Sequence, residues 1–152
     1  MRTTFLSFLG AISLMSALGC TPEGTAEPCV TQADCYPDID PAQLAGAVTC
    51  LDRVEAGYCT HECTNDADCC AVDGVCDDRV KQVCAPFEST GVMLCFLSCS
   101  ADDLEATGFT ETDGDGQGDL GAQFCRARAH PEFGCRSTGG GSANRKVCVP
   151  GG

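Results

Sequence analysis

The sequence has no tryptophan, only two tyrosines and few basic residues, which restricts both its core and its partners. Nine Lys and Arg residues against 22 Asp and Glu residues give a net charge of −13. So acidic a surface disfavours binding to nucleic acid and to anionic lipid. Beyond the N-terminal segment the longest apolar run is 92–97. It is too short to cross a bilayer and supplies little material for a hydrophobic core.

Motifs of common catalytic chemistry are also missing. There is no Gly-x-Ser-x-Gly, and no glycine-rich loop leads into Gly-Lys-Ser/Thr. The two histidines, His61 and His130, stand in ordinary contexts, and we expect both to be exposed loop residues rather than catalytic bases. The sequence therefore predicts that the protein is not an enzyme.

Cysteine is abundant instead, at 15 of 152 residues. A content of about 10% is typical of scaffolds held by disulfides, which form in an oxidising compartment. Zinc is disfavoured because no Cys-x-x-Cys pair is present. We predict a small, loop-dominated, disulfide-rich fold. We expect it to bind no cofactor, apart from a weak calcium site. The cysteines expected to be bridged are Cys29, Cys35, Cys50, Cys59, Cys63, Cys69, Cys70, Cys76, Cys84, Cys95, Cys99, Cys125, Cys135 and Cys148.

The first 19 residues are typical of an export signal. Arg2 supplies a positive charge, an apolar run follows from Phe5 to Leu18, and small residues precede Cys20. The stretch Ala17-Leu18-Gly19-Cys20 resembles the lipobox of bacterial lipoproteins, which implies that Cys20 is acylated and becomes the mature N-terminus. Removing Cys20 from the count leaves 15 − 1 = 14 cysteines, an even number that fits complete pairing. The alternative is ordinary signal-peptidase cleavage, with Cys20 free or bridged.

We expect an exported lipoprotein of the outer membrane, on its periplasmic or its cell-surface face. It would contact the membrane only through the lipid on Cys20, and residues 20–28 would form a polar tether to the first folded unit.

An internal repeat follows the tether. Five residues separate Cys29 from Cys35 and also Cys63 from Cys69, and Asp-Arg-Val occurs shortly after both Cys50 and Cys76. This alignment predicts one cysteine module at 29–59, with an insertion at 36–49, and a second at 63–84. Residues 85–152 would form a C-terminal cysteine-rich module.

Equivalent positions in a repeat should pair equivalently. Alternating pairing predicts Cys29–Cys50 and Cys35–Cys59 in the first module. In the second it predicts Cys63–Cys76 and Cys69–Cys84, which leaves Cys70 to bridge to Cys95. Cys99, Cys125, Cys135 and Cys148 would then close the last module.

The string Cys63-Thr-Asn-Asp-Ala-Asp-Cys-Cys70, followed by Cys76 and Cys84, resembles half of the Dickkopf N-terminal cysteine-rich domain. It is also similar to inhibitor cystine knots and, more loosely, to whey-acidic-type modules. As a class, myxobacterial-type secreted lipoproteins look like this. The resemblance implies a small disulfide-rich fold, and its cystine-knot form implies a Cys59–Cys70 bridge instead of the symmetric pairing.

Short local signals predict several further elements. Asp40 and Pro41 favour one helical turn, and Ser100 and Gly108 favour a helix over 101–107. A hairpin is expected from Phe133 to Val149, with Cys135 and Cys148 on facing strands. Asp66 and Asp68 lie between cysteines, where we expect their carboxylates to accept bonds from backbone amides rather than to bind metal.

The segment 113–120 resembles the first eight positions of a calcium loop. Its candidate ligands are Asp113, Asp115, Gln117 and Asp119. The twelfth position should be a bidentate Glu but is Phe124, so calcium binding would be weak. The alternative is a flexible acidic glycine loop leading to Cys125.

The function expected from these patterns is a lipid-anchored binding or structural role at the bacterial cell envelope, with a protein partner at the cell surface. The alternative is a surface-presented protease inhibitor with its bait at 36–49 or 85–94. The only basic area is C-terminal, and it would pair with the acidic modules or face an acidic partner. It comprises Arg126, Arg128, Arg136, Arg145 and Lys146.

Overall fold

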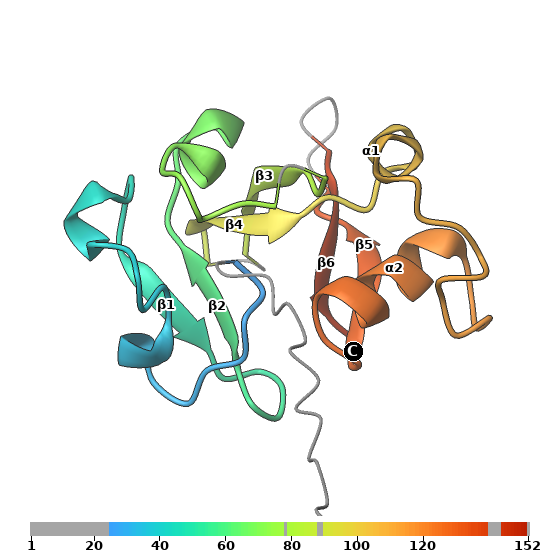
Figure 1. Ribbon diagram of the computed structural model, residues 1–152, viewed down its shortest axis with the longest axis horizontal. Coiled ribbons are helices and arrows are strands. Elements are labelled where there is room, and N and C mark those ends of the chain that lie inside the picture. The colour runs from blue at the N-terminus through green and yellow to red at the C-terminus, as the bar shows by residue number, and fades with distance from the viewer. Residues whose placement is uncertain (1–24, 78, 88–89, 140–143, 152) are drawn as a thin grey trace, which may run out of the picture.

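Three two-stranded antiparallel hairpins follow one another along the chain (Figure 1). The computed structural model describes residues 25–77, 79–87, 90–139 and 144–151. Cys20 and the expected signal at 1–19 lie outside the described residues. The elements in chain order are η1 (Gln32–Asp34), η2 (Pro41–Gln43), β1 (Val48–Leu51), β2 (Tyr58–His61), η3 (Asp66–Cys70), β3 (Gln82–Pro86), β4 (Met93–Leu97), α1 (Ala101–Thr107), α2 (Leu120–Arg128), β5 (Phe133–Ser137) and β6 (Lys146–Pro150). The protein is a small, loop-rich, cysteine-rich domain, as the sequence predicts.

Each hairpin carries one cysteine on each strand, directly opposite the other. The facing pairs are Cys50 and Cys59, Cys84 and Cys95, and Cys135 and Cys148. None of these pairs forms a disulfide with itself. Both cysteines of a hairpin instead bond to the chain that precedes it, so each hairpin is fastened at two points.

The disulfides follow one rule in all three hairpins. The cysteine on the first strand bonds to the first cysteine of its unit, and the cysteine on the second strand bonds to the second. The bonds are Cys29–Cys50 and Cys35–Cys59, then Cys63–Cys84 and Cys69–Cys95, then Cys99–Cys135 and Cys125–Cys148. The structure is therefore a threefold repeat, with units at 29–59, 63–95 and 99–148.

Backbone hydrogen bonds repeat with the same period. The third residue after each unit's last cysteine donates its amide to the carbonyl three residues before the cysteine on the first strand of that unit's hairpin. These bonds run from Glu62 to Ala47 at 2.9 Å, from Ser98 to Lys81 at 2.9 Å and from Gly151 to Glu132 at 2.7 Å. The first two of these donor residues also form isolated β-bridges to the following hairpin, Glu62 to Leu94 and Ser98 to Val147. The hairpins are thus joined by backbone pairing as well as by connecting residues.

The residues just before Cys29, from Thr25 onward, belong to the folded body. Ala26 donates its amide to the carbonyl of Cys59 at 3.0 Å, and the amide of Cys59 donates to the carbonyl of Glu27 at 2.8 Å. Thr25 is buried and shares a 2.9 Å hydrogen bond with the hydroxyl of Tyr36. Residues 25–27 of the tether expected at 20–28 are therefore part of the folded body, and 20–24 lie outside the described residues.

Aromatic rings from all three units meet in the core. Tyr58 of β2, Phe96 of β4 and Phe133 of β5 are each buried. The Tyr58 ring lies 6.2 Å from that of Phe96 and 4.8 Å from that of Phe133, measured between centroids. Ring pairs at such separations are favourable beyond the area they bury. A second cluster, built around Tyr36, Leu44, Val48 and Val75, lies within and beside the first unit.

The pairing predicted for the second module is wrong. Cys63 bonds to Cys84 rather than to Cys76, Cys69 bonds to Cys95, and Cys70 bonds to Cys76. The Cys59–Cys70 bridge of the cystine-knot alternative is also absent, because Cys59 bonds to Cys35. Register explains the error, since Cys84 and Cys95 occupy the facing hairpin positions that Cys50 and Cys59 hold in the first unit.

Several local predictions are confirmed. Ser100 accepts a hydrogen bond from the amide of Asp103 at the start of α1, and Gly108 ends the helix in the left-handed region at φ 70°. The turn at Pro41 is a 3-10 helix capped by Asp40. Helix α2 was not predicted. It replaces the flexible approach to Cys125 with an ordered element that packs beside β5.

A substitution at Gly57 tests the close contact between the first hairpin and the chain at Cys29. Its φ is +61°, and an added Cβ would collide with the carbonyl oxygen of Cys29 and lie within 2.9 Å of the Cys29 and Cys50 sulfurs. We expect Gly57→Ala to lower the free energy of unfolding by about 3 kcal/mol, comparable to losing a bridge. Thermal unfolding and titration of free thiols measure this.

The matched control is Gly74→Ala. Gly74 has φ +89° with no atom within 4 Å of an added Cβ, so it carries the conformational strain alone, about 1 kcal/mol. Equal losses at the two positions would contradict the steric account.

The Cys70–Cys76 bond has no counterpart in the other units and spans only 6 residues, against 26 for Cys69–Cys95. Because a shorter loop restricts the unfolded chain less, replacing Cys70 and Cys76 by Ser should cost about 2 kcal/mol. Replacing the buried Cys69 and Cys95 should cost about 3.5 kcal/mol or more. Denaturant unfolding of the two double variants checks the order, and a reversed order would contradict it.

Candidate functional site

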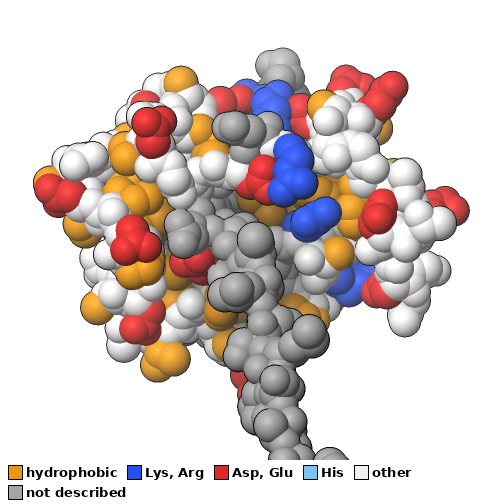
Figure 2. All heavy atoms as spheres, viewed as in Figure 1, with side chains coloured by type: hydrophobic (Ala, Val, Ile, Leu, Met, Phe, Trp, Pro, Cys, Tyr) orange, Lys and Arg blue, Asp and Glu red, His pale blue; other side chains and the backbone are white. Residues whose placement is uncertain are grey.

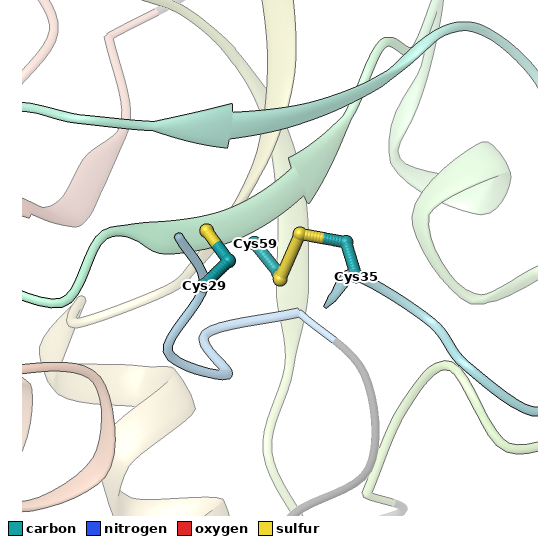
Figure 3. A group of neighbouring side chains, drawn as sticks. All are labelled: Cys29, Cys35 and Cys59. Atoms are coloured by element: carbon teal, nitrogen blue, oxygen red, sulfur yellow. A yellow bond between two sulfur atoms is a disulfide. The ribbon is translucent and has the colours of Figure 1, made fainter. Parts of the chain in front are cut away.

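Sulfur atoms gather at three places where a metal ion would find ligands within 4.8 Å of one another. One group is Cys29, Cys35 and Cys59 (Figure 3). Each sulfur is already in a disulfide, and a metal requires the thiolate form. The other two groups, Cys63, Cys69 and Cys95 and then Cys99, Cys125 and Cys135, are bonded in the same way. The clusters hold the fold together and offer no metal site.

The three acidic candidates for calcium ligands, Asp113, Asp115 and Asp119, form no cluster. Asp113 accepts hydrogen bonds from the amide and hydroxyl of Thr110, at 2.9 and 2.7 Å. Asp119 caps α2 by accepting from the amide of Ala122 at 2.8 Å. Across residues 25–77, 79–87, 90–139 and 144–151, no group of three acidic side chains comes as close as the sulfur groups do. The resemblance to a calcium loop is therefore not matched by a ligand cage.

An arginine holds the loop where calcium was expected. Arg126 of α2 donates to both oxygens of Asp115, at 2.6 and 2.7 Å, and also to the carbonyl of Gln117. Gln123, from the same helix, accepts from the amide of Gly116 and donates to the carbonyl of Gly118, both at 3.2 Å. Two side chains of α2 thus order a segment whose sequence reads as a flexible glycine loop.

This pair sets the ionisation of the Asp115 carboxyl. The hydrogen bonds from Arg126, together with that from the amide of Gln117, lower the pKa of Asp115 to about 2. The same contact raises the pKa of Arg126. Both groups are charged at neutral pH, so the guanidinium already balances a carboxylate that a calcium ion would need.

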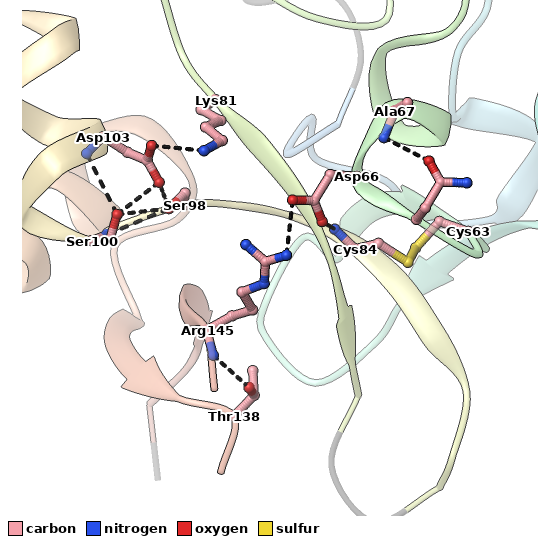
Figure 4. A network of polar contacts seen from close by, with 11 residues as sticks. Cys63, Asp66, Ala67, Lys81, Cys84, Ser98, Ser100, Asp103, Thr138 and Arg145 are labelled. Atoms are coloured by element: carbon pink, nitrogen blue, oxygen red, sulfur yellow. Dashed lines mark hydrogen bonds and ion pairs between the residues drawn. A yellow bond between two sulfur atoms is a disulfide. The ribbon is translucent and has the colours of Figure 1, made fainter. Parts of the chain in front are cut away.

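Asp66 and Asp68 have the backbone role predicted for them. Asp68 accepts from the amides of Thr64 and Asn65, at 2.7 and 3.1 Å, and bonds with Thr64 lower its pKa. Asp66 accepts from the amide of Cys84 at 3.1 Å and also pairs with Arg145 at 3.1 Å (Figure 4). The carboxylate of Asp66 therefore joins the second unit to the third.

The exposed position predicted for His61 is wrong. Every residue of β2 is buried, and His61 is 0% exposed because the next hairpin covers it. Its ring packs edge-on against Tyr36 with centroids 5.7 Å apart, and its Nδ1 lies 2.9 Å from the carbonyl oxygen of Glu62. His130 lies in the loop before β5, with Nε2 2.7 Å from the carbonyl oxygen of Glu55. Both rings serve contacts within the fold.

The basic residues of the C-terminal part divide by location. Arg126 pairs with Asp115 within the third unit, and Arg145 pairs with Asp66 of the second. Of these two contacts, that of Arg145 is with an acidic module, as one alternative predicted, whereas Arg126 pairs within the C-terminal part itself. Arg136, Arg145 and Lys146 lie on or next to the β5–β6 hairpin.

A cleft of about 260 Å³ lies between the end of β3 and this hairpin. Pro86 and Phe87 line it from β3, and Val147, Val149 and Pro150 line it from β6. Arg136, Ser137 and Thr138 supply its polar groups. No pattern in the sequence pointed to this cleft, because its walls come from segments some 50 residues apart (from about 86 to 136) and join only through the repeat packing.

Comparison with protein-family models, curated proteins and solved structures gives no match for the chain. The resemblance of 29–84 to the Dickkopf and cystine-knot scaffolds stays a prediction.

Acid titration tests the Asp115–Arg126 pair. Because the folded-state pKa of Asp115, about 2, lies below its unfolded value of about 3.9, the pair stabilises the fold above pH 4. That contribution is lost as the pH falls toward 2. We expect Asp115→Asn to melt below the wild type at pH 7 and the difference to close between pH 4 and pH 2.

The control is Asp38→Asn, which removes the same charge from an exposed position. A melting difference for Asp115→Asn that persists at pH 2, or one no larger than that of Asp38→Asn at pH 7, would contradict the role of the pair.

Proposed function

We propose that the protein is a lipid-anchored, extracytoplasmic binding or structural protein of the bacterial cell envelope. The observation that carries the proposal is the covalent repeat, in which seven disulfides fix three hairpins and the loops before them. So many disulfides point to an oxidising, extracytoplasmic location. A surface ordered before it meets its partner loses less entropy on binding, which suits recognition.

The contacts of the candidate nucleophiles support binding over catalysis. Ser98 and Ser100 donate their hydroxyls to the carboxylate of Asp103, at 2.5 and 2.7 Å, and Lys81 pairs with the same group at 3.0 Å (Figure 4). These bonds tie the end of β4 to α1 and to the residue before β3. A nucleophile needs a base within reach, and the buried His61 ring contacts neither serine in the bonds described here.

The protease-inhibitor alternative receives less support. A bait must lie exposed and extended to enter a protease cleft. Segment 36–49 contains the 3-10 turn η2 and buries Leu44 and Val48. In segment 85–94, Ala85 pairs with Leu94 and Pro86 with Met93. Leu44, Val48 and the paired ends of 85–94 are engaged in the fold's own contacts, whereas 37–38, 40–43 and 90–92 are exposed.

The anchor is the part of the proposal that rests on sequence. Of the helices in the described ranges, none has the length and apolar character needed to cross a membrane. Acylation of Cys20 would supply attachment by another route, since each buried CH₂ contributes about 0.8 kcal/mol.

Replacing Cys20 by Ser tests the anchor. We expect the wild-type protein to fractionate with membranes and Cys20→Ser to move to the soluble fraction, because the acylated thiol is gone. The matched control replaces Cys70 and Cys76 by Ser, which changes cysteines without touching the N-terminus and should leave the protein with the membranes. An unmodified Cys20 in the mass spectrum of the mature N-terminal peptide would refute the proposal.

A further inference from the structure

The cleft between the end of β3 and the β5–β6 hairpin combines an apolar interior with a cation at its edge. Phe87 and Val147 are 8% and 1% exposed, so the inner walls are anchored in the core. Arg136, on β5 opposite Val147, lines the same cleft, with the hydroxyls of Ser137 and Thr138 beside it. Such a combination favours a ligand with an apolar group next to an acceptor of hydrogen bonds.

The charges around the cleft indicate that this hydrogen-bond acceptor is an anion. The segment 133–150 carries Arg136, Arg145 and Lys146 and no Asp or Glu, in a chain of net charge −13. In Figure 2, Lys and Arg side chains gather beside hydrophobic surface in the upper middle of the view, and acidic side chains lie next to them as well as elsewhere on this face. An anion is repelled by most of this protein and attracted here.

The hairpin already holds one carboxylate in a comparable way. Arg145 pairs with Asp66 across a neighbouring, wider hollow, and that hollow shares Pro86 and Thr138 with the cleft. The pair lies at 3.1 Å with the two side chains 44% and 35% exposed. A carboxylate from the opposite wall thus meets a hairpin cation in the structure itself.

We propose that this cleft binds an apolar carboxylate, with the apolar group between Phe87 and Val149 and the carboxylate on the guanidinium of Arg136. Arg136 takes part in a contact within the protein, and its five N–H donors allow it to hold a ligand carboxylate as well. Two sources share this chemistry, the C-terminal residue of a peptide and a free organic acid.

The site is ordered before binding. The hairpin is paired from Phe133 with Pro150 to Ser137 with Lys146, and the amide of Thr138 extends it by donating to the carbonyl of Arg145 at 2.8 Å. Disulfides fasten both strands, through Cys135 and Cys148. Little ordering entropy is therefore lost when a ligand enters.

The test titrates N-acetyl-leucine and N-acetyl-leucinamide into the purified, oxidised protein by calorimetry and two-dimensional NMR. The two compounds differ in one group, a carboxylate in the first and a neutral amide in the second. We expect saturable binding of the acid, with shifts at Val147, Val149 and Arg136, and binding of the amide at least about tenfold weaker. Octanoate and an acetylated tripeptide ending in leucine separate the organic-acid source from the peptide source.

Variants locate the site. Arg136→Gln should weaken binding of the acid by about tenfold, while Arg136→Lys should retain part of it. The matched control, Arg128→Gln, removes the same charge from an exposed position at the end of α2. This variant should bind the acid as the wild type does.

Equal binding of acid and amide, equal losses in Arg136→Gln and Arg128→Gln, or no saturation at ~10 mM ligand would each overturn the inference. It rests on the proposed binding role but not on the lipid anchor. Failure here leaves the Cys20 experiment to decide the anchor separately.

Discussion

The structure depends on pairs of disulfides that fasten each hairpin to the chain before it. A two-stranded hairpin alone is at best marginally stable in water. Here each strand of a hairpin carries one cysteine, and the two facing cysteines bond backward to two different points, as Cys50 and Cys59 do to Cys29 and Cys35. The hairpin and its preceding loop therefore stay joined covalently, and in the first unit a small apolar cluster around Tyr36, Leu44 and Val48 adds to this.

The units depend on one another for their core. Each contributes a buried ring to one shared contact, formed by Tyr58, Phe96 and Phe133. The β-bridges from Glu62 to Leu94 and from Ser98 to Val147 fix the position of each hairpin relative to the next. Disulfides thus act within units while rings and backbone pairing act between them, so the repeat behaves as a short array in which neighbours complete one another.

The sequence predicts the fold class and the first unit's bonds because cysteine density and spacing are local signals. It misleads in the second unit, where Asp-Arg-Val aligns Cys76 with Cys50, although strand register places Cys84 there. In the third unit a long insertion separates Cys99 from Cys125 and hides the repeat. Spacing along the chain does not show which distant segments meet. The sequence therefore could not predict the burial of His61, the Asp115–Arg126 pair, or the cleft between the end of β3 and the β5–β6 hairpin.

Thr25 belongs to the folded body, because its hydroxyl bonds to that of Tyr36. If Cys20 carries lipid, four residues, 21–24, separate the acylated residue from Thr25, a reach of at most about 17 Å. A folded domain of this length is wider than that reach, so the anchored body would stay close to the bilayer. A partner would have to come to the membrane surface, and encounters would take place in two dimensions, where diffusion along the membrane rather than through the surrounding space sets their frequency.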